Sequence, residues 1–537
     1  MEPTLAYGLP AAFILYLIYK RVTKITLDDI RGPEAETFWL GNLGQLFRSL
    51  VGEADFAWQD KFGGVARIKG PVGQDILWVC DPRAMQFIMN GAYKFPKTSE
   101  RVALGTLSTD RGLVTAQDDC HKRQRKAMLP AFGTPESKAL FPIFVRNAEA
   151  ITTRWRDQLF DSPEGKMFNI PTWVSCATLD AIGEAAFDHT FGAIDNQTSD
   201  FVKSYQSLLI KSFASPTDGR IIMQNLSRYL PVNFVIWLYD HLPLYKLLRK
   251  NREVAHKFGK EILASKDAAL AKGADSHDLL AIIVRSNMSE NERSKLTDYE
   301  VLSQIRTILL AGHETTSTAL SWGLLELAKN PAIQSKLRAE IHAMDNTIKA
   351  HGRSSFTVED LDKMPYTQAC LKEVLRFHPP VYHLHRAVGQ DTAIPLSKPV
   401  TTKSGTEINE VPVAKGTSIV LSIAAYNRDK SVWGEDAHVF NPERWLNQSE
   451  KKDISVGIFS NLATFAGGPR ACIGWRFAVY EIQAFMIELV SNFEFNLTED
   501  CKLIRREPVF IMAPTVEGQV GKGAQMPLKV TLAQRGE

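Results

Sequence analysis

The most specific signal in the chain is the stretch Phe465-Ala466-Gly467-Gly468-Pro469-Arg470-Ala471-Cys472-Ile473-Gly474. Its cysteine lies between glycines and an arginine, directly before an apolar run at helical spacing over residues 475–481. At such a loop-to-helix junction, the helix N-terminus and free backbone N–H groups favour a thiolate. We therefore expect Cys472 to be the ligand of an iron atom. The alternative is a glycine-rich turn that holds a buried structural cysteine.

The neighbours of Cys472 support the iron-ligand interpretation. Gly468 and Gly474 would let the backbone approach a flat cofactor closely, because neither has a side chain. Arg470 could pair with a carboxylate of that cofactor. The fixed order F-x-x-G-x-R-x-C-x-G, which begins at Phe465, is rare by chance because cysteine is a scarce residue.

Composition and charge narrow the class of protein. With 537 residues, 45% of them hydrophobic and 23% charged, the chain could form several domains or one large enzyme body. A net charge of +3 gives no reason to expect a nucleic acid as the partner. The six cysteines are scattered without a C-x-x-C pair, which argues against a zinc site or a disulfide framework and favours a reducing compartment.

The N-terminus carries an uncharged, largely apolar run over residues 3–19, followed by Lys20 and Arg21. This run is just long enough to cross a bilayer. Because Glu2 precedes it and Tyr19-Lys20-Arg21 follows, we expect a retained signal anchor rather than a cleaved signal peptide. The positive flank predicts a single-pass protein whose body lies on the cytosolic side. The alternative for this run is a buried core helix.

Helical patterns dominate the rest of the chain. Residues 64–80 alternate around Gly70-Pro71 and predict a β-hairpin, and short strand patterns return at 401–420 and 526–533. Between residue 81 and about residue 350 the signals are mostly helical. We expect a mostly α protein with small β-sheets (α+β): an anchor at residues 1–20, a basic Gly/Pro connector at 21–50 and one large catalytic domain at 51–537.

The strongest helix signal lies in the middle of the chain. Thr297 and Glu300 form a capping box, apolar residues recur at helical spacing after them, and Pro331 ends the pattern. The centre of this long helix is Ala311-Gly312-His313-Glu314-Thr315-Thr316, where glycine and β-branched residues weaken helix propensity. Local rules that are broken in this way often mark a functional site.

The spacing of that central stretch suggests a use. Ala311, Gly312, Thr315 and Ala319 share one face and would leave room for a flat ring and a diatomic ligand. Thr315 and Glu314 could pass protons through water to dioxygen that is being reduced. The alternative is a close helix–helix crossing in which the threonine hydroxyls bond to the backbone. We expect His313 to be a neutral packing or surface histidine rather than a ligand.

Charged side chains form further candidate groups. Glu373 and Arg376 lie at i and i+3 on a predicted helix over residues 366–377, where they can pair. Arg444 could complete a cluster that clamps the segment leading into the cysteine loop. His121 and Arg125 lie one turn apart, suited to two carboxylates of a cofactor. The alternative for that turn is a solvated basic helix, and its Lys122, Arg123 and Lys126 could form a docking patch for an acidic redox partner.

Taken together, these four motifs resemble the cytochrome P450 family, in its microsomal and fungal form. The resemblance implies that Cys472 is the proximal thiolate of haem b, Thr315 the oxygen-activating threonine and Glu314 its acidic neighbour in proton delivery. It implies a structural triad of Glu373, Arg376 and Arg444. The implied haem neighbours are His121, where many members have tryptophan, and Arg125, Arg386, Arg470, Phe465, Gly468, Gly474 and Ala311.

The resemblance also implies an activity and partners. It implies a monooxygenase of the endoplasmic reticulum membrane that inserts one oxygen atom into a lipophilic small molecule: a terpenoid, a fatty acid or an aromatic secondary metabolite. The sequence carries no dinucleotide fingerprint, so electrons would come from a separate NADPH-dependent cytochrome reductase, with cytochrome b5 as a second donor. The rival functions are a haem-thiolate isomerase or dehydratase that needs no dioxygen, and a non-enzymatic haem protein.

By the same resemblance, the substrate pocket would be lined by residues 101–113, 201–242, 381–385 and 510–515 and by the central helix near Ala311. These segments are rich in Leu, Ile, Phe and Val, as a pocket for a lipophilic ligand would be. Five residues are expected either to dip into the membrane as an entry lip or to pack in the core: Leu230, Pro231, Phe234, Ile236 and Trp237.

Overall fold

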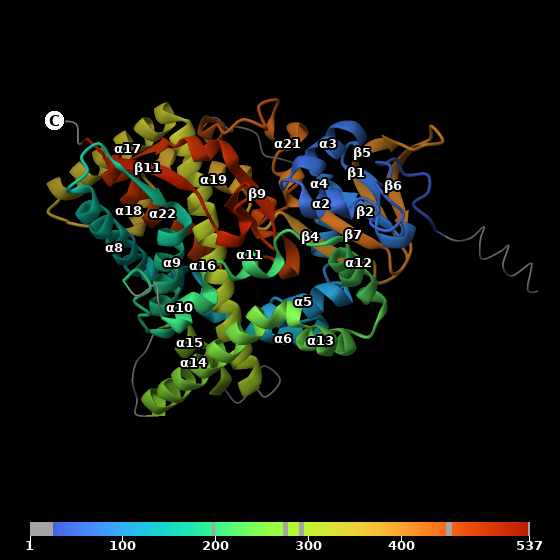
Figure 1. Ribbon diagram of the computed structural model, residues 1–537, viewed down its shortest axis with the longest axis horizontal. Helices are drawn as coiled ribbons and strands as arrows, with labels where there is room; N and C mark the ends of the chain where they lie inside the picture. Colours follow the sequence, from blue (N-terminus) through green and yellow to red (C-terminus); the bar gives the residue numbers. More distant parts are fainter. Residues whose placement is uncertain (1–24, 196–198, 272–277, 289–294, 447–453, 535–537) are drawn as a thin grey trace, which may run out of the picture.

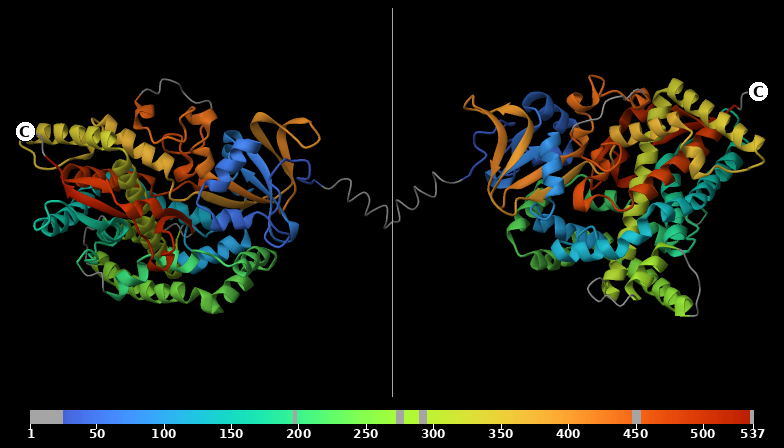
Figure 2. Two further views of the ribbon diagram at one scale, coloured as in Figure 1. Left: turned by 45° about the horizontal axis from the view of Figure 1, so that its top comes forward. Right: turned by 180° about the vertical axis from the view of Figure 1, so that it is seen from behind.

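The computed structural model describes residues 25–195, 199–271, 278–288, 295–446 and 454–534 (Figure 1). Helices make up most of the described chain and the strands form small sheets, as the sequence predicts. The four-stranded sheet lies at one end of the molecule and the longest helices fill the other end (Figures 1 and 2). The predicted anchor at residues 1–20 lies outside the described residues, within which no helix is both long and apolar enough to cross a membrane.

The largest sheet has the strand order β1-β2-β7-β4. Strands β1 (Val65–Lys69) and β2 (Asp75–Val79) form the predicted hairpin around the 3-10 helix η1 (Pro71–Gly73). Strand β7 (Ser418–Ser422) lies parallel to β2, and β4 (His383–Ala387) pairs antiparallel with β7. The sheet therefore places β4 at its edge, where His385 and Arg386 point to opposite faces.

The smaller sheets join segments that are far apart in the sequence. Strands β5 (Thr392–Thr401) and β6 (Glu407–Val413) form one antiparallel pair, and β9 (Ile504–Pro508) and β10 (Met512–Val516) form another. Strand β11 (Pro527–Leu532) lies between β3 (Lys166–Asn169) and β8 (Phe493–Leu497). Strands β6, β7 and β11 confirm the predicted strand regions. The sequence patterns do not predict β3, β4, β8, β9 and β10, because such short strands depend on distant partners.

The N-terminal helices follow clear local signals. The side chain of Asp81 accepts hydrogen bonds from the backbone N–H groups of Arg83 and Ala84, and Pro82 occupies the first position of α4. In α6, Asp118 begins the helix and complements its dipole. The elements of this part are α2 (Leu43–Arg48), α3 (Glu53–Phe62), α4 (Pro82–Asn90), α5 (Ser99–Thr109), α6 (Asp118–Met128), η2 (Leu129–Phe132), α7 (Thr134–Ala139), α8 (Phe141–Leu159) and α9 (Ile170–Phe187).

The following helices are short until α14, and Pro216, Pro231 and Pro243 lie at or just before the starts of α12, α13 and η4. On α13 and the turn before it, Leu230, Phe234 and Trp237 are exposed, so the core-packing alternative is wrong for these side chains. Ile236 is half-buried and packs against the core. The elements of this part are α10 (Asp200–Tyr205), α11 (Leu208–Phe213), α12 (Asp218–Leu226), η3 (Ser227–Tyr229), α13 (Val232–His241), η4 (Pro243–Tyr245), α14 (Lys246–Ala271) and α15 (Leu279–Met288).

The central helix α16 (Asp298–Lys329) confirms the prediction of one long helix that crosses the molecule (Figure 1). The capping box is present: Thr297 Oγ1 accepts from the Glu300 N–H at 3.2 Å, and the Glu300 carboxylate accepts from the Thr297 N–H at 2.9 Å. The helix stays continuous through Gly312 and ends before Pro331. Helices α9 and α22 pack against it, so burial offsets the weak propensity at its centre.

The last part of the chain wraps around α16 and carries the cysteine loop. Helix α22 packs on α8 through the Phe144 and Phe477 rings, whose centroids are 4.7 Å apart. The elements are α17 (Pro331–Ala350), α18 (Val358–Leu361), α19 (Pro365–Phe377), α20 (Ile423–Tyr426), α21 (Lys430–Trp433), η6 (Pro442–Trp445), η7 (Ala463–Phe465), η8 (Gly468–Arg470), α22 (Trp475–Asn492), η9 (Glu499–Leu503) and η10 (Val520–Lys522).

Candidate active site

The cysteine loop runs from η7 through η8 to the first turn of α22. The backbone N–H of Cys472 donates to the carbonyl of Phe465 at 2.8 Å, which closes the loop on itself. Gly468 has a φ of +65°, and a Cβ there would collide with the backbone of Met89 on α4. The structure thus gives Gly468 a reason to be glycine that the sequence did not suggest: left-handed backbone packed against a neighbouring helix.

Cys472 is exposed to solvent, although protein surrounds most of its thiol. Burial raises its pKa, whereas the Gly474 N–H directed at the sulfur and the nearby Arg125 guanidinium lower it. Gly474 precedes α22, and a Cβ there would meet only Phe132 at an ordinary distance of 3.6 Å. The N–H of Gly474 and the charge of Arg125 are both suited to a thiolate once a cation lies against the sulfur.

The structure brings the predicted propionate partners together. His121 and Arg125 come from α6, Arg386 from β4 and Arg470 from η8. His121 is buried, and its Nδ1 lies 3.0 Å from the hydroxyl of Tyr93. Burial, followed by the charges of the neighbouring cations, lowers the pKa of His121 to about 3, so this histidine is neutral at physiological pH.

The guanidinium groups of this cluster are held by neutral acceptors. Arg125 donates to the Ala471 carbonyl at 2.7 Å, and Arg470 donates to the Ala116 carbonyl at 2.8 Å. Burial lowers the pKa of Arg386 to about 10, and the charge of Arg470 adds to the effect. Within the described residues, no Asp or Glu forms an ion pair with any of these cations, and Arg470 Nε is buried without a partner. The cluster therefore carries positive charge that the protein does not neutralise.

Lys97 belongs to the same cluster, although the sequence did not single it out. It precedes α5, donates to the carbonyl of Val114 and faces Arg386 and Arg470. Burial holds its pKa well below the usual range, and those two charges lower it further. A lone lysine before a helix usually faces solvent, so its position carried no signal that could have revealed it.

The predicted small-residue face at the centre of α16 is only partly open in the structure. Ala311 is exposed and Thr315 is half-buried on a helix whose other central residues are mostly buried. Gly312 instead faces α9, where a Cβ would come within 2.8 Å of the Ile182 side chain. The close-crossing alternative therefore holds for Gly312, and the prediction is also wrong for Ala319, which is fully buried. The open face consists of Ala311 and Thr315. The Thr315 hydroxyl donates to the Ala311 carbonyl at 2.8 Å.

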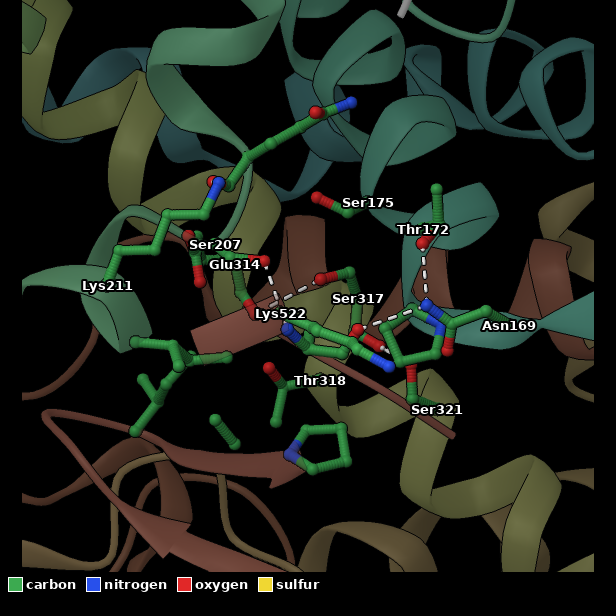
Figure 3. A pocket seen from close by; sticks show the side chains of 17 residues that line it. Asn169, Thr172, Ser175, Ser207, Lys211, Glu314, Ser317, Thr318, Ser321 and Lys522 are labelled. Carbon is green, nitrogen blue, oxygen red and sulfur yellow. Dashed lines mark hydrogen bonds between the residues drawn. The ribbon is translucent and has the colours of Figure 1, made fainter. Parts of the chain in front are cut away.

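Glu314 points away from Thr315, because consecutive helix residues are turned by about 100°. Its buried carboxyl borders a polar pocket of about 130 Å³ whose lining includes Ser317, Thr318 and Lys211 (Figure 3). Burial raises the pKa of Glu314 to about 8, and only the Leu208 N–H and the charge of Lys211 oppose this. The carboxyl is therefore protonated at neutral pH. His313 is buried against Tyr205 with ring centroids 5.6 Å apart, as expected for a packing histidine.

The Glu373, Arg376 and Arg444 side chains meet in the structure. Arg376 donates to both carboxylate oxygens of Glu373 at 2.9 and 2.7 Å, and Arg444 donates to one of them at 3.1 Å. Glu373 and Arg376 are fully buried on α19. The group joins α19 to η6 and to the segment that leads into the cysteine loop.

The expected docking patch on α6 is smaller than the sequence suggested. Arg123 does not face outward, because it forms an ion pair with Glu300 and donates to the Lys295 carbonyl at 2.6 Å. Lys122 is exposed but pairs with Asp119 at 2.8 Å, and Lys126 is exposed. Arg123 thus joins α6 to the capping box of α16, which is a structural role.

Haem fits this set of donors. The thiol of Cys472 is exposed and can ligate iron. Ala311 is also exposed, and its small side chain leaves room for a flat ring. The two propionates of haem are carboxylates, and they would neutralise the positive charge of the cluster of Lys97, Arg125 and Arg470. The unpartnered Arg470 Nε and the neutral His121 provide further donors.

Comparison with known proteins identifies the family. The family model described as "Cytochrome P450" matches residues 31–520. Cytochrome P450 monooxygenase 205 of Postia placenta is 31% identical over 518 residues, which cover 94% of this chain and 92% of the relative. Ganoderic acid synthetase CYP5150L8 of Ganoderma lucidum is 32% identical over 521 residues, with coverages of 91% and 92%. Together with the cysteine loop, the family match establishes that this chain belongs to the cytochrome P450 family.

Proposed function

We propose that this protein is a haem-thiolate monooxygenase that inserts one oxygen atom of dioxygen into a lipophilic small molecule. The observation that carries the proposal is the open Cys472 thiol beside a cation cluster that no carboxylate of the described residues neutralises. Relatives in the family are named monooxygenases, and one is named a ganoderic acid synthetase. Haem b bound at this site supplies the activation of dioxygen, and a thiolate ligand favours cleavage of the O–O bond.

The cluster around Arg470 positions the cofactor. Arg125 and Arg470 are already held by backbone carbonyls, so little side-chain entropy is lost when they bind propionates. When His121 Nδ1 accepts from Tyr93, its Nε2–H is free to donate to a propionate. Lys97 and Arg386 add charge, and the propionates relieve the repulsion among these groups.

Glu314 and Thr315 handle protons on the opposite side of the site. Because its pKa is about 8, Glu314 holds a proton at neutral pH that it can give up. The polar pocket beside it offers water a path from the protein surface. Since Glu314 and Thr315 face different directions, water would carry the proton from Glu314 toward the face that Thr315 lines. Thr315 donates its own proton to the Ala311 carbonyl, so its Oγ1 can accept a hydrogen bond from that water and orient it.

The proposal includes a membrane and a redox partner. Residues 1–20 serve as a single-pass anchor in the endoplasmic reticulum membrane, residues 21–50 as the connector and residues 51–537 as the catalytic domain on the cytosolic side. The exposed Phe38 and Trp39, together with Phe234 and Trp237 on α13, support a body that rests on the bilayer. An NADPH-dependent cytochrome reductase, with cytochrome b5 as a second donor, supplies electrons.

The test uses the full-length protein loaded with haem, a cytochrome reductase, NADPH and a panel of lipophiles. Product formation is expected to need both dioxygen and the reductase. Thr315→Ala is expected to lower product formation by roughly 100-fold, since proton delivery contributes on that order, while NADPH is still consumed. Product that forms without dioxygen would favour the isomerase or dehydratase alternative instead.

A further inference from the structure

A second, small pocket lies between α2, α5, α11, α12 and the turn that joins β9 to β10. Its walls are largely aromatic and apolar: Phe47, Leu104, Phe213 and Phe510, with the Phe213 and Phe510 rings 4.5 Å apart. Arg101 and Arg220 also line it. No Asp or Glu stands among the described residues that form this wall. An apolar pocket with guanidinium groups and no acidic residue is unusual, because buried charges are normally paired.

Arg220 already has an acceptor within the protein. It donates to the Ser212 carbonyl, and its guanidinium lies over the rings of Phe213 and Tyr245 at 5.4 and 5.6 Å. Gln224, which also lines the pocket, donates to the Tyr245 hydroxyl at 2.8 Å. The protein therefore holds Arg220 and Gln224 in place, and we do not assign either of them to a ligand.

Arg101 is different, because its guanidinium has no acceptor in the described part of the chain. It lies over the Phe47 ring at 5.5 Å, is half-buried, and has its pKa lowered by burial. The neighbouring Glu100 accepts from the Thr98 hydroxyl at 2.6 Å and forms no ion pair with Arg101. A guanidinium presents a planar fork of N–H donors, so an unpaired one in an apolar pocket is suited to a planar anion.

The pocket lies close to the candidate haem site. Lys97, in the cation cluster, precedes α5, and Arg101 follows about one helical turn later. On β4, Arg386 faces that cluster, whereas His385 stacks with Phe47 at 6.4 Å on the other face. The C-terminal end of α5 also packs against the N-terminal third of α16, where Arg306 donates to the Leu107 carbonyl at 2.7 Å and Thr307 to the Thr109 carbonyl at 3.2 Å. A molecule anchored at Arg101 can therefore extend an apolar body toward the helix that carries Ala311.

We propose that the substrate is a lipophilic carboxylic acid and that Arg101 binds its carboxylate. The inference rests on the proposed function and names the substrate class for the same site. A carboxylate matches the guanidinium in shape and charge and can accept two parallel N–H bonds. A phosphate would need more donors than this pocket offers. Because the carboxylate is held at Arg101, oxidation takes place away from the carboxyl end of the molecule.

The test measures ligand binding to the haem-loaded protein by equilibrium dialysis. It uses two matched pairs of ligands: dodecanoic acid with its methyl ester, and abietic acid with its methyl ester. Dialysis reports binding without turnover. At least one acid is expected to bind the wild type about 10-fold or more tightly than its ester, as one charged hydrogen-bonded pair provides. Arg101→Leu removes that preference, Arg101→Gln removes most of it, and Arg101→Lys keeps part of it.

The matched control is Arg83→Leu, which removes the same charge at an exposed position on α4, outside the segments expected to line the substrate pocket. It is expected to retain the wild-type preference. The inference is overturned when the wild type binds neither acid more tightly than its ester, or when both Arg101→Leu and Arg101→Gln keep the preference. If the protein gives a thiolate-type spectrum and oxygen-dependent turnover but shows no preference for the acids, this inference is overturned and the proposed function stands. Loss of the spectrum itself counts against the proposed function.

Discussion

Two of the molecule's arginine clusters differ in how their charge is balanced. In the first, the Glu373 carboxylate accepts from Arg376, Arg444 and the Trp445 indole. In the second, Lys97, Arg125 and Arg470 lie together, and their hydrogen-bond acceptors among the described residues are carbonyls and an amide. The first cluster is complete without a ligand, whereas the second is electrostatically favourable only once an anion joins it. We therefore infer that the first cluster stabilises the fold and that the second binds a cofactor.

The largest expected effect comes from breaking the complete cluster. Glu373→Ala leaves Arg376, which is fully buried, without its carboxylate, and is expected to cost about 3–5 kcal/mol of unfolding free energy. Denaturant unfolding and soluble yield measure this loss. The control is Glu443→Ala, which breaks the exposed Lys336–Glu443 pair nearby and is expected to cost less than about 1 kcal/mol. Equal losses in the two variants would mean that the buried cluster is not structural.

The sequence predicted the complete cluster better than the open one, for a physical reason. Glu373 and Arg376 lie one turn apart on a helix, so their pairing follows from local geometry. The same reasoning placed His121 and Arg125 on one face of α6. Lys97 was missed, because it reaches the cluster only through the tertiary fold. Long-range strand pairing, as between β3 and β11, was missed for the same reason.

The centre of α16 shows where spacing was insufficient. The helix, its capping box and its last residue follow from the sequence, since each depends on neighbouring residues. Gly312 was assigned to the open face because helical spacing gives the direction of a residue but not which element packs against it. Ile182 of α9 decides it, and no pattern within α16 reveals that contact.

A smaller effect is expected from the open cluster, and it should separate cofactor binding from folding. Lys97→Met removes one buried charge, so haem retention is expected to weaken roughly 10-fold. The unfolding free energy of the haem-free protein should not fall, because repulsion with Arg386 and Arg470 is relieved. Haem transfer to a scavenging apoprotein measures retention, with Lys94→Met, at an exposed position, as the control. A variant that loses stability while it retains haem would reverse the distinction between the clusters.

A further prediction concerns the pH dependence of stability. The pKa of Glu314 is raised from 4.5 to about 8 in the folded state, so between these values the folded protein binds more protons than the unfolded chain. Stability therefore falls as pH rises toward about 8, by at most about 1.4 kcal/mol per pH unit for this group. The facing charges are Lys211, which opposes the shift, and Lys522, which lines the same pocket.

Glu314→Gln is expected to flatten this slope between pH 6 and pH 8, measured by denaturant unfolding at each pH. Glu326→Gln is the matched control, because Glu326 is buried beside His378, which holds its pKa at about 2, below the range of the measurement. An unchanged slope in Glu314→Gln would show that this carboxyl is ionised at neutral pH. It could not then act as the proton donor proposed for this site.

The most direct test of the central claim is the absorption spectrum of the haem-loaded protein in its ferrous carbonyl form. With Cys472 as the axial thiolate, the wild type is expected to give the red-shifted Soret band of a thiolate-ligated haem. Cys472→Ala is expected to lose that band, while Cys501→Ala, which replaces a cysteine outside the loop, is expected to keep it. A wild-type band at the position of a histidine-ligated haem, or a thiolate band that persists in Cys472→Ala, would contradict the account.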